Sequence, residues 1–228
     1  MIEVDKIVTI SLTADIERQE QTKKELEKLQ LKTDFFLTER DIENRERGCF
    51  QSHVHVARNA LHTNIKSLLV FEDDVKILPF TQKQIGAINH FLKTNKTKFD
   101  ALYLGLIVGK MWISGNFFTV RYPIVRAKGA GSQAYILSRE GMEKLSRYEY
   151  TGTAIDKLIK HDFKCYSIYP IIANQYSKYQ SPSKTYSQAL LDERIADDLF
   201  WKNNLKKQKG MLCKNLHKTL SEMIGLGK

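Results

Sequence analysis

Long apolar runs are missing from this 228-residue sequence. No stretch approaches the roughly 20 apolar residues that a membrane-spanning helix requires, so the chain is not expected to cross a membrane. The opening residues 1–6 also lack the basic and then apolar segments of a secretory signal, and they run directly into a strand-like segment. These two absences predict a cytoplasmic protein.

Cysteine is scarce. The sequence has three, Cys49, Cys165 and Cys213, and they are far apart. An odd number at such spacing fits neither a disulfide framework nor the paired spacing of zinc ligands. We expect reduced and mostly buried thiols, and the sequence assigns them no role.

Internal repeats and low-complexity tracts are also absent, apart from a polar, Ser- and Tyr-rich segment at residues 175–188 that predicts a loop. With 42% hydrophobic and 27% charged residues, the composition is that of an ordinary soluble globular protein. The length suits one domain with an appendage. We place a catalytic domain at residues 1–190 and a helical, basic C-terminal appendage at residues 191–228.

Positive charge is what the sequence has in excess. The formal net charge is +10 and the isoelectric point is near 9.4. Such a molecule attracts polyanions, which include nucleic acid, phosphorylated sugar donors and anionic membranes. Charge alone does not choose among them.

The hydrophobic pattern predicts strands that alternate with helices. Short apolar segments at 6–12, 33–38, 68–71 and 101–106 indicate strands, and later segments at 117–121 and 133–137 resemble them. The clearest helix covers residues 48–62, and others are expected after the first strand and at 138–147. This alternation predicts an α/β fold with a mostly parallel central sheet, in which ligands bind at the carboxyl ends of the strands.

Three consecutive acids, Glu72, Asp73 and Asp74, follow the buried strand LLVF. Alternate side chains of an extended chain share a direction, so Glu72 and Asp74 are expected to converge while Asp73 points away. Adjacent carboxylates repel one another unless a cation neutralises them, and hard oxygen ligands favour Mg²⁺ or Mn²⁺. The simpler alternative is that these acids cap a following helix or face solvent.

Several motifs, taken in order, resemble glycosyltransferase family 25, the lipooligosaccharide type. They are KIVTISLTADIERQ, ERGCFQSHVHVARNAL, LLVFEDDV, DALYLG, GSQAYILSREGMEKL, TAIDKLI and CYSIYPIIANQ, and they extend over about residues 6 to 175. The resemblance implies a GT-A-like fold and an inverting galactosyltransferase. The implied ligands are a UDP-sugar donor, Mn²⁺ or Mg²⁺, and a saccharide acceptor, which includes lipid-linked saccharides such as lipooligosaccharide.

By this resemblance Asp74 is the principal metal ligand, and Glu72 and Asp73 contact the donor or support the metal. Further residues that the resemblance places near the donor are Ser11, Leu12, Arg18, His53 and Gln133. Ser11 departs from the family's usual asparagine. Simpler alternatives are that His53 is a packed core residue, that Arg18 is a solvated helix residue, and that Gln133 and Tyr135 only pack.

Asp156 corresponds to the family's acid on the acceptor side and is the candidate general base. An inverting transfer needs a carboxylate to deprotonate the acceptor hydroxyl. The alternative is structural, because Thr153 to Asp156 resembles a capping box at a helix start. Lys157 stands where the family commonly has a tryptophan, which affects the expected acceptor specificity.

The C-terminal segment combines lysines with an apolar stripe of Leu212, Leu216, Leu220 and Met223. A basic amphipathic helix predicts attachment to an anionic membrane surface, here the inner face of the cytoplasmic membrane. Alternatively, the stripe docks on the domain or pairs with a second subunit in a homo-oligomer.

Two other functions use the same features. A metal-dependent nuclease or phosphodiesterase would use the same carboxylates, but the basic residues gather in the tail and lack the aromatic interleaving of a nucleic-acid groove. Nucleic acid is therefore not the expected partner. A non-catalytic carbohydrate-binding protein would fit the two departures from the family, but it would not need the intact acidic cluster.

Overall fold

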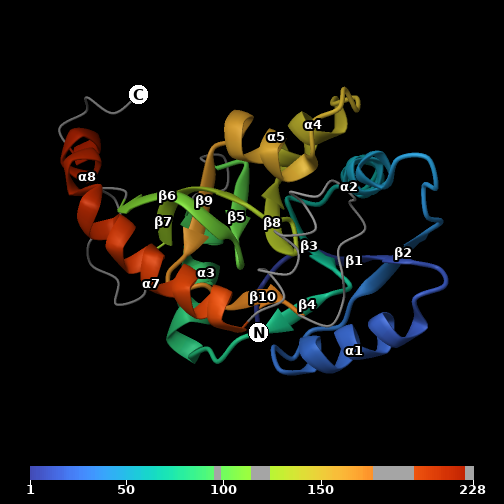
Figure 1. The fold of residues 1–228 in the computed structure, drawn as a ribbon, viewed down its shortest axis with the longest axis horizontal. Helices are drawn as coiled ribbons and strands as arrows, with labels where there is room; N and C mark the ends of the chain where they lie inside the picture. Colours follow the sequence, from blue (N-terminus) through green and yellow to red (C-terminus); the bar gives the residue numbers. More distant parts are fainter. Residues whose placement is uncertain (95–98, 114–123, 177–197, 224–228) are drawn as a thin grey trace.

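An eight-stranded sheet with strand order β2-β1-β3-β8-β5-β9-β7-β6 lies at the centre of the molecule (Figure 1). The computed structural model describes residues 1–94, 99–113, 124–176 and 198–223. Six of these strands run in one direction, and β7 and β8 run in the other. The expected α/β, GT-A-like fold with a mostly parallel sheet is confirmed. The strands of this sheet are β1 (Lys6–Leu12), β2 (Asp34–Thr38), β3 (Ser67–Glu72), β5 (Ala101–Tyr103), β6 (Ile107–Ile113), β7 (Ile124–Ala130), β8 (Ala134–Ser138) and β9 (Cys165–Ile168).

Helices cover both faces of this sheet. In Figure 1, α2, α4 and α5 lie on one side of the strands, and α1 and α3 lie on the other. A further pair of short strands, β4 (Val75–Ile77) and β10 (Ala173–Gln175), forms a separate antiparallel ribbon beyond the end of β3. The helices are α1 (Ile16–Glu27), α2 (Arg45–Leu61), α3 (Gln82–Thr94), α4 (Arg139–Ser146), α5 (Ile155–Asp162), α7 (Asp198–Lys214) and α8 (Leu216–Met223).

The alternation of side chains along β3 explains why there are two cores. Leu68 and Val70 join the apolar cluster beneath α2, α4 and α5, whereas Leu69 and Phe71 join the cluster with α1 and α3. All four side chains are buried because a sheet covered on both faces has no exposed side in its central strands. The continuous apolar run LLVF is the sequence signature of such a strand.

Several expected boundaries differ from those observed. The segment 101–106 forms a strand only to Tyr103, and beyond it Gly105 passes so close to Ala173 that a Cβ there would lie 2.3 Å from the Ala173 carbonyl oxygen. Helix α2 begins at Arg45, three residues before the predicted start, because the Asn44 side chain caps it by accepting a hydrogen bond from the Arg47 amide. The predicted strand at 117–121, most of the predicted loop at 175–188 and the proposed boundary at 190 lie outside the described residues.

Helix α7 covers the open edge of the sheet. The Asn204 side chain accepts a hydrogen bond from the Val108 amide and donates one to the Leu106 carbonyl, and Asn215 donates to the Met111 carbonyl. These amides satisfy backbone groups of β6 that would otherwise remain open to pairing with another chain. Trp201 of the same helix is buried in the core. The first part of the basic segment is therefore integrated with the sheet.

Candidate active site

The three acids lie where β3 leaves the sheet. Glu72 is the last residue of β3, and Asp73 and Asp74 form the turn into β4. The chain is therefore no longer extended after Glu72, and no helix follows for the acids to cap. The expectation that Asp73 points away from the other two does not apply in this turn, and contacts with Arg18 bring Asp73 and Asp74 together.

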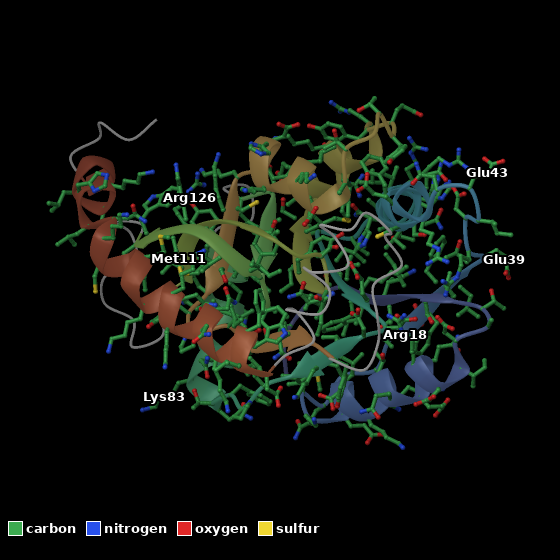
Figure 2. The ribbon with its side chains drawn as sticks, viewed as in Figure 1. Arg18, Glu39, Glu43, Lys83, Met111 and Arg126 are labelled. Atoms are coloured by element: carbon green, nitrogen blue, oxygen red, sulfur yellow. The ribbon has the colours of Figure 1, made fainter. Side chains whose placement is uncertain are left out.

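Asp73 is held by side chains from β1 and α1. Ser11 Oγ donates a hydrogen bond to Asp73 Oδ2 at 2.5 Å, and Arg18 forms an ion pair with Oδ1. Thr22 Oγ1 donates to the Asp73 carbonyl at 2.9 Å. Burial nevertheless raises the pKa of Asp73, although Arg18 and Ser11 oppose this shift. Ser11 thus uses its hydroxyl on the acidic turn, and Arg18, labelled in Figure 2, reaches this turn from α1.

Asp74 lies in the least compensated electrostatic environment of the three. Burial and the negative charge of Glu72 raise the pKa of Asp74 to about 7. Its Oδ2 accepts a hydrogen bond from Gln175 Nε2 at 3.3 Å and lies 3.6 Å from Arg18 Nη2, whereas Oδ1 is buried and has no hydrogen-bond partner in the part of the chain that the structure describes. The Tyr176 amide donates to the Asp74 carbonyl at 2.7 Å, which ties the turn to β10. Among the described residues, Arg18 and Gln175 thus contact one oxygen of this carboxylate and leave the other without a partner.

Glu72 is positioned by a buried histidine. His53 Nε2 lies 3.3 Å from Glu72 Oε1, and His53 Nδ1 lies 2.7 Å from the Tyr135 hydroxyl. Burial works against the charged form of Glu72, but hydrogen bonds with His53 and Ser132 hold its pKa below the ordinary value. His53 is thus buried and fully paired, and it also orients a carboxylate of the cluster.

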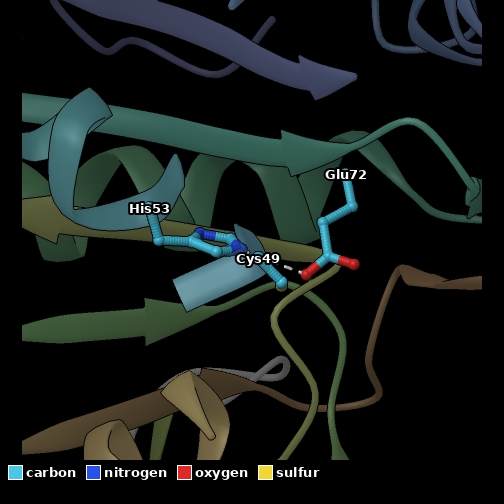
Figure 3. Close-up of side chains that lie close together, drawn as sticks. All are labelled: Cys49, His53 and Glu72. Carbon is cyan, nitrogen blue, oxygen red and sulfur yellow. Dashed lines mark hydrogen bonds and ion pairs between the residues drawn. The ribbon is translucent and has the colours of Figure 1, made fainter. Parts of the chain in front are cut away.

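Cys49 belongs to the same cluster, although sequence reasoning gave it no role. Its sulfur, the Glu72 carboxylate and a ring nitrogen of His53 all lie within 4.8 Å of one another (Figure 3). The expectation of mostly buried thiols is wrong, since Cys165 is buried but Cys49 and Cys213 are exposed. The four-residue spacing of Cys49 and His53 in one helix was a visible signal, but their proximity to Glu72 depends on the packing of α2 against β3.

The pKa of the Cys49 thiol is influenced by several nearby acids. Desolvation of the sulfur raises its pKa well above the ordinary value, although part of the residue is exposed, and the charges of nearby acids raise it further. Those acids are Glu72, Asp156, Asp74 and Glu46. Negative charge from β3, the turn after it, α5 and α2 therefore acts on this one thiol.

Asp156 approaches this region from α5. Its Oδ2 accepts a hydrogen bond from the Gly131 amide at 3.3 Å, and its Oδ1 accepts one from the Lys157 amide at 2.7 Å. The Glu72 amide donates to the carbonyl of Gln133, and the backbone from the Gly131 amide to this carbonyl spans three residues, so these two anchoring points are at most about 10 Å apart. The predicted capping box is absent: α5 begins at Ile155, and its N-cap, Ala154, makes no side-chain capping bond.

Gln133 is fully buried, and neither end of its side-chain amide has a hydrogen-bond partner among the described residues. A Cβ on Gly131, whose φ is +104°, would lie 2.4 Å from Gln133 Oε1, and a Cβ on Gly105 would lie 3.0 Å from Nε2. The two glycines therefore leave space for this amide, whose donor and acceptor are both available. Leu12 contributes its carbonyl, which accepts hydrogen bonds from the Gln19 side chain and the Asp15 amide.

These residues suit a divalent cation. Asp74 offers a buried oxygen without a partner among the described residues, and burial together with the charge of Glu72 raises the pKa of its carboxyl to about 7. Glu72 adds a second carboxylate close enough for its charge to contribute to that shift. Hard oxygen ligands of this kind match Mg²⁺ or Mn²⁺, and a bound cation would offset the repulsion between the acids.

Comparisons with known proteins identify the family of the chain. The model of glycosyltransferase family 25 (LPS biosynthesis protein) matches residues 36–159, which include α2, the acidic turn and Asp156. Procollagen galactosyltransferase 1-A of Xenopus laevis is 32% identical over 66 residues, which are 29% of this chain and 11% of that protein. The match thus covers about a tenth of that relative's length.

Solved structures are more distant. A197 from STIV shares 13% identity with a TM-score of 0.42, and the match covers 75% of this chain and 85% of that one. A glycosyltransferase involved in the glycosylation of the major capsid of PBCV-1 shares 13% identity with a TM-score of 0.35, over 61% of this chain and 63% of that one. The family match itself covers more than half of the sequence. The chain belongs to glycosyltransferase family 25.

Proposed function

We propose that the chain is an inverting, metal-assisted glycosyltransferase that moves galactose from UDP-galactose to a saccharide acceptor such as lipooligosaccharide. The observation that carries this proposal is the buried Oδ1 of Asp74, which has no hydrogen-bond partner among the described residues and belongs to a carboxyl whose pKa is raised to about 7. Burial of such a polar atom lowers the stability of the fold unless a ligand compensates for the lost interaction with water. Asp74 and Glu72 would hold Mn²⁺ or Mg²⁺, which would stabilise negative charge on the diphosphate.

The proposed roles of the remaining residues follow from their positions. Asp156 accepts the proton of the acceptor hydroxyl while that oxygen bonds to the anomeric carbon, and the bond from this carbon to the diphosphate oxygen breaks on the opposite side. UDP leaves with the bonding electrons, and the configuration inverts. Gln133 offers its amide to hydroxyl groups of the donor sugar, and Arg18 contributes positive charge beside the acidic turn.

A screen of nucleotide sugars tests this proposal directly. The intact protein is heated with each sugar nucleotide, with and without Mn²⁺, and its unfolding temperature is recorded. Stabilisation by UDP-galactose that requires Mn²⁺ supports the proposal, because a ligand stabilises the folded state according to its affinity. Equal stabilisation without metal, or stabilisation by no sugar nucleotide, contradicts it.

The C-terminal helices support a second element of the proposal, peripheral attachment to an anionic membrane surface. Leu216 and Leu220 of α8 are 51% and 54% exposed, whereas Leu212 packs against the core. Exposed lysines accompany them at positions 202, 206, 207, 209 and 214. None of the described helices combines the length and apolar character needed to span a bilayer. Attachment would therefore use surface contacts, which would bring the acidic turn to a lipid-linked acceptor.

A further inference from the structure

Three side chains of different chemistry meet at the end of β3. Cys49 and His53 are four residues apart in α2, so they lie on one face of that helix, and Glu72 reaches the same point from the sheet (Figure 3). One ligand atom from each lies within 4.8 Å of the other two. Thiol, imidazole and carboxylate are the three side-chain groups that bind zinc in proteins.

The distance between two of these groups fits tetrahedral coordination. Nitrogen and oxygen ligands bind zinc at about 2.0–2.1 Å, which places two such atoms about 3.3 Å apart at the tetrahedral angle. His53 Nε2 and Glu72 Oε1 are 3.3 Å apart. A cation could replace the hydrogen bond between them without moving either atom far.

The other nitrogen of His53 has the partner that a metal-bound histidine needs. When Nε2 binds a metal through its lone pair, Nδ1 carries the proton and requires an acceptor. The Tyr135 hydroxyl lies 2.7 Å from Nδ1, and Tyr135 is fully buried in β8. This contact fixes the ring so that Nε2 faces Glu72 and Cys49.

The ligand set also discriminates between metals. A soft thiolate and an imidazole favour Zn²⁺, whereas Mn²⁺ and Mg²⁺ favour carboxylates such as Asp74. Glu72 keeps 20% of its side-chain surface exposed and Cys49 is exposed, so an ion can reach the cluster from solvent. Three protein ligands leave the fourth tetrahedral position for water.

We propose that Cys49, His53 and Glu72 bind one Zn²⁺ ion, and that zinc here withdraws Glu72 from the acidic turn and blocks metal-dependent donor binding. On binding, the Cys49 thiol loses its proton to solvent and its sulfur bonds to the metal. Zinc binding stands on the geometry of the three residues alone. The blocking effect rests on the function proposed above.

Cobalt provides a spectroscopic test of the binding step. Co²⁺ takes the place of zinc in tetrahedral sites, and a thiolate ligand gives it a charge-transfer absorption in the near ultraviolet. Titration of the full chain with Co²⁺ should produce this absorption at one equivalent, and Zn²⁺ should remove it. Cys49→Ser should abolish the absorption, whereas Cys213→Ser, which changes an exposed thiol on α7, should retain it. His53→Gln should abolish it as well, with circular dichroism as the check on folding.

The proposal is overturned if the wild-type chain gives no thiolate absorption, or if the absorption survives Cys49→Ser. For the blocking effect, UDP binding in excess Mn²⁺ is measured against increasing Zn²⁺, and affinity should fall at least tenfold in the wild type but not in Cys49→Ser. An equal response to zinc in both proteins overturns the blocking effect. If cobalt binds through Cys49 but UDP never requires Mn²⁺, the zinc site stands and the proposed function fails.

Discussion

Arg18 contacts two neighbouring carboxylates through one guanidinium nitrogen: Nη2 pairs with Oδ1 of Asp73 and lies 3.6 Å from Oδ2 of Asp74. Both acids are buried, and Arg18 itself keeps only 20% of its side-chain surface exposed. The arginine thus supplies positive charge within the acidic turn. Asp74 nevertheless retains a raised pKa, which shows that this compensation is incomplete.

Replacing this arginine should reveal how much the turn depends on it. Arg18→Met should lower the free energy of unfolding by about 1–2 kcal/mol without divalent cations, less than for a fully buried pair because the guanidinium is partly exposed. Added Mn²⁺ should restore much of the loss, since it would neutralise the same carboxylates. Thermal unfolding with and without Mn²⁺ measures this. The control Lys23→Met changes an exposed residue of the same helix and should behave like the wild type. Unfolding of Arg18→Met that is insensitive to Mn²⁺ would argue against a cation at this turn.

Asp74→Asn should separate metal binding from folding. A carboxyl whose pKa is raised in the folded state costs stability once the pH rises above its ordinary value, so removal of this charge should not lower the unfolding temperature at pH 8. Calorimetry should show UDP binding that depends on Mn²⁺ in the wild type and is lost in the variant. Asp100→Asn is a matched control at an acid outside the turn, where Lys144 is its partner. Unchanged, metal-dependent UDP binding in Asp74→Asn would remove this residue from the metal site.

Asp156→Asn should retain donor binding but lose transfer. We expect a fall in transfer of 10²–10⁴-fold, the range typical of general-base removal. The asparagine side chain has one oxygen, so it can keep only one of the two hydrogen bonds that Oδ2 and Oδ1 accept from the Gly131 and Lys157 amides, and a loss of about 1 kcal/mol of stability is expected. Product formation and thermal unfolding are measured on the same preparation. Near-normal transfer together with a loss of about 1 kcal/mol of stability would indicate a purely structural role.

Glu25 predicts how stability depends on pH. Its carboxylate, 2% exposed, accepts hydrogen bonds from the Ile77 amide, Lys28 and the Tyr176 hydroxyl, and thereby ties α1 to β4 and to the residue after β10. Burial opposes the charged form, but these hydrogen bonds outweigh it and lower the pKa of Glu25 below 4.5. A lowered pKa stabilises the fold above pH 4.5, and this contribution disappears as the pH falls through the folded-state pKa.

Glu25→Gln should therefore cost about 1–3 kcal/mol at pH 7, the range for hydrogen bonds to a charged group. The difference from the wild type should shrink as the pH falls below 4.5, and denaturant unfolding at several pH values measures it. Glu27→Gln, at an exposed position of the same helix, should show neither effect. A difference that stays constant down to pH 3 would contradict the assignment.

The exposed leucines of α8 predict reversible membrane binding. Leu216→Ser combined with Leu220→Ser should abolish sedimentation with anionic vesicles, while UDP binding and transfer to a soluble acceptor remain. Each lysine near such a surface contributes about 1 kcal/mol, and the attraction extends about 10 Å at 0.1 M salt, so binding of the wild type should weaken as salt is added. Leu37→Ser, at a leucine 48% exposed on β2, should not affect binding. If the wild-type protein does not sediment with anionic vesicles at low salt, the proposed membrane attachment is wrong.

The sequence by itself determined the elements whose signals are local. The buried strand β3 follows from the run LLVF, α2 follows from apolar residues at helical spacing, and the ordered motifs led to the family. The position of the acids at 72–74 was predictable for the same reason, because polar residues directly after a buried strand lie at the carboxyl end of that strand. Each of these signals depends on neighbours within one segment of the chain.

Only the tertiary structure decided which distant residues meet. The antiparallel β8 separates β3 from β5 and brings Tyr135 to His53, 82 residues away. Likewise, Asn204 satisfies the edge of β6 from about 100 residues away, although the sequence indicated only a basic appendage. Such contacts depend on the strand order and on how each helix packs. The free energy that selects this arrangement is shared among many weak contacts across both cores. These contacts join residues far apart in the sequence, so no local sequence pattern predicts them.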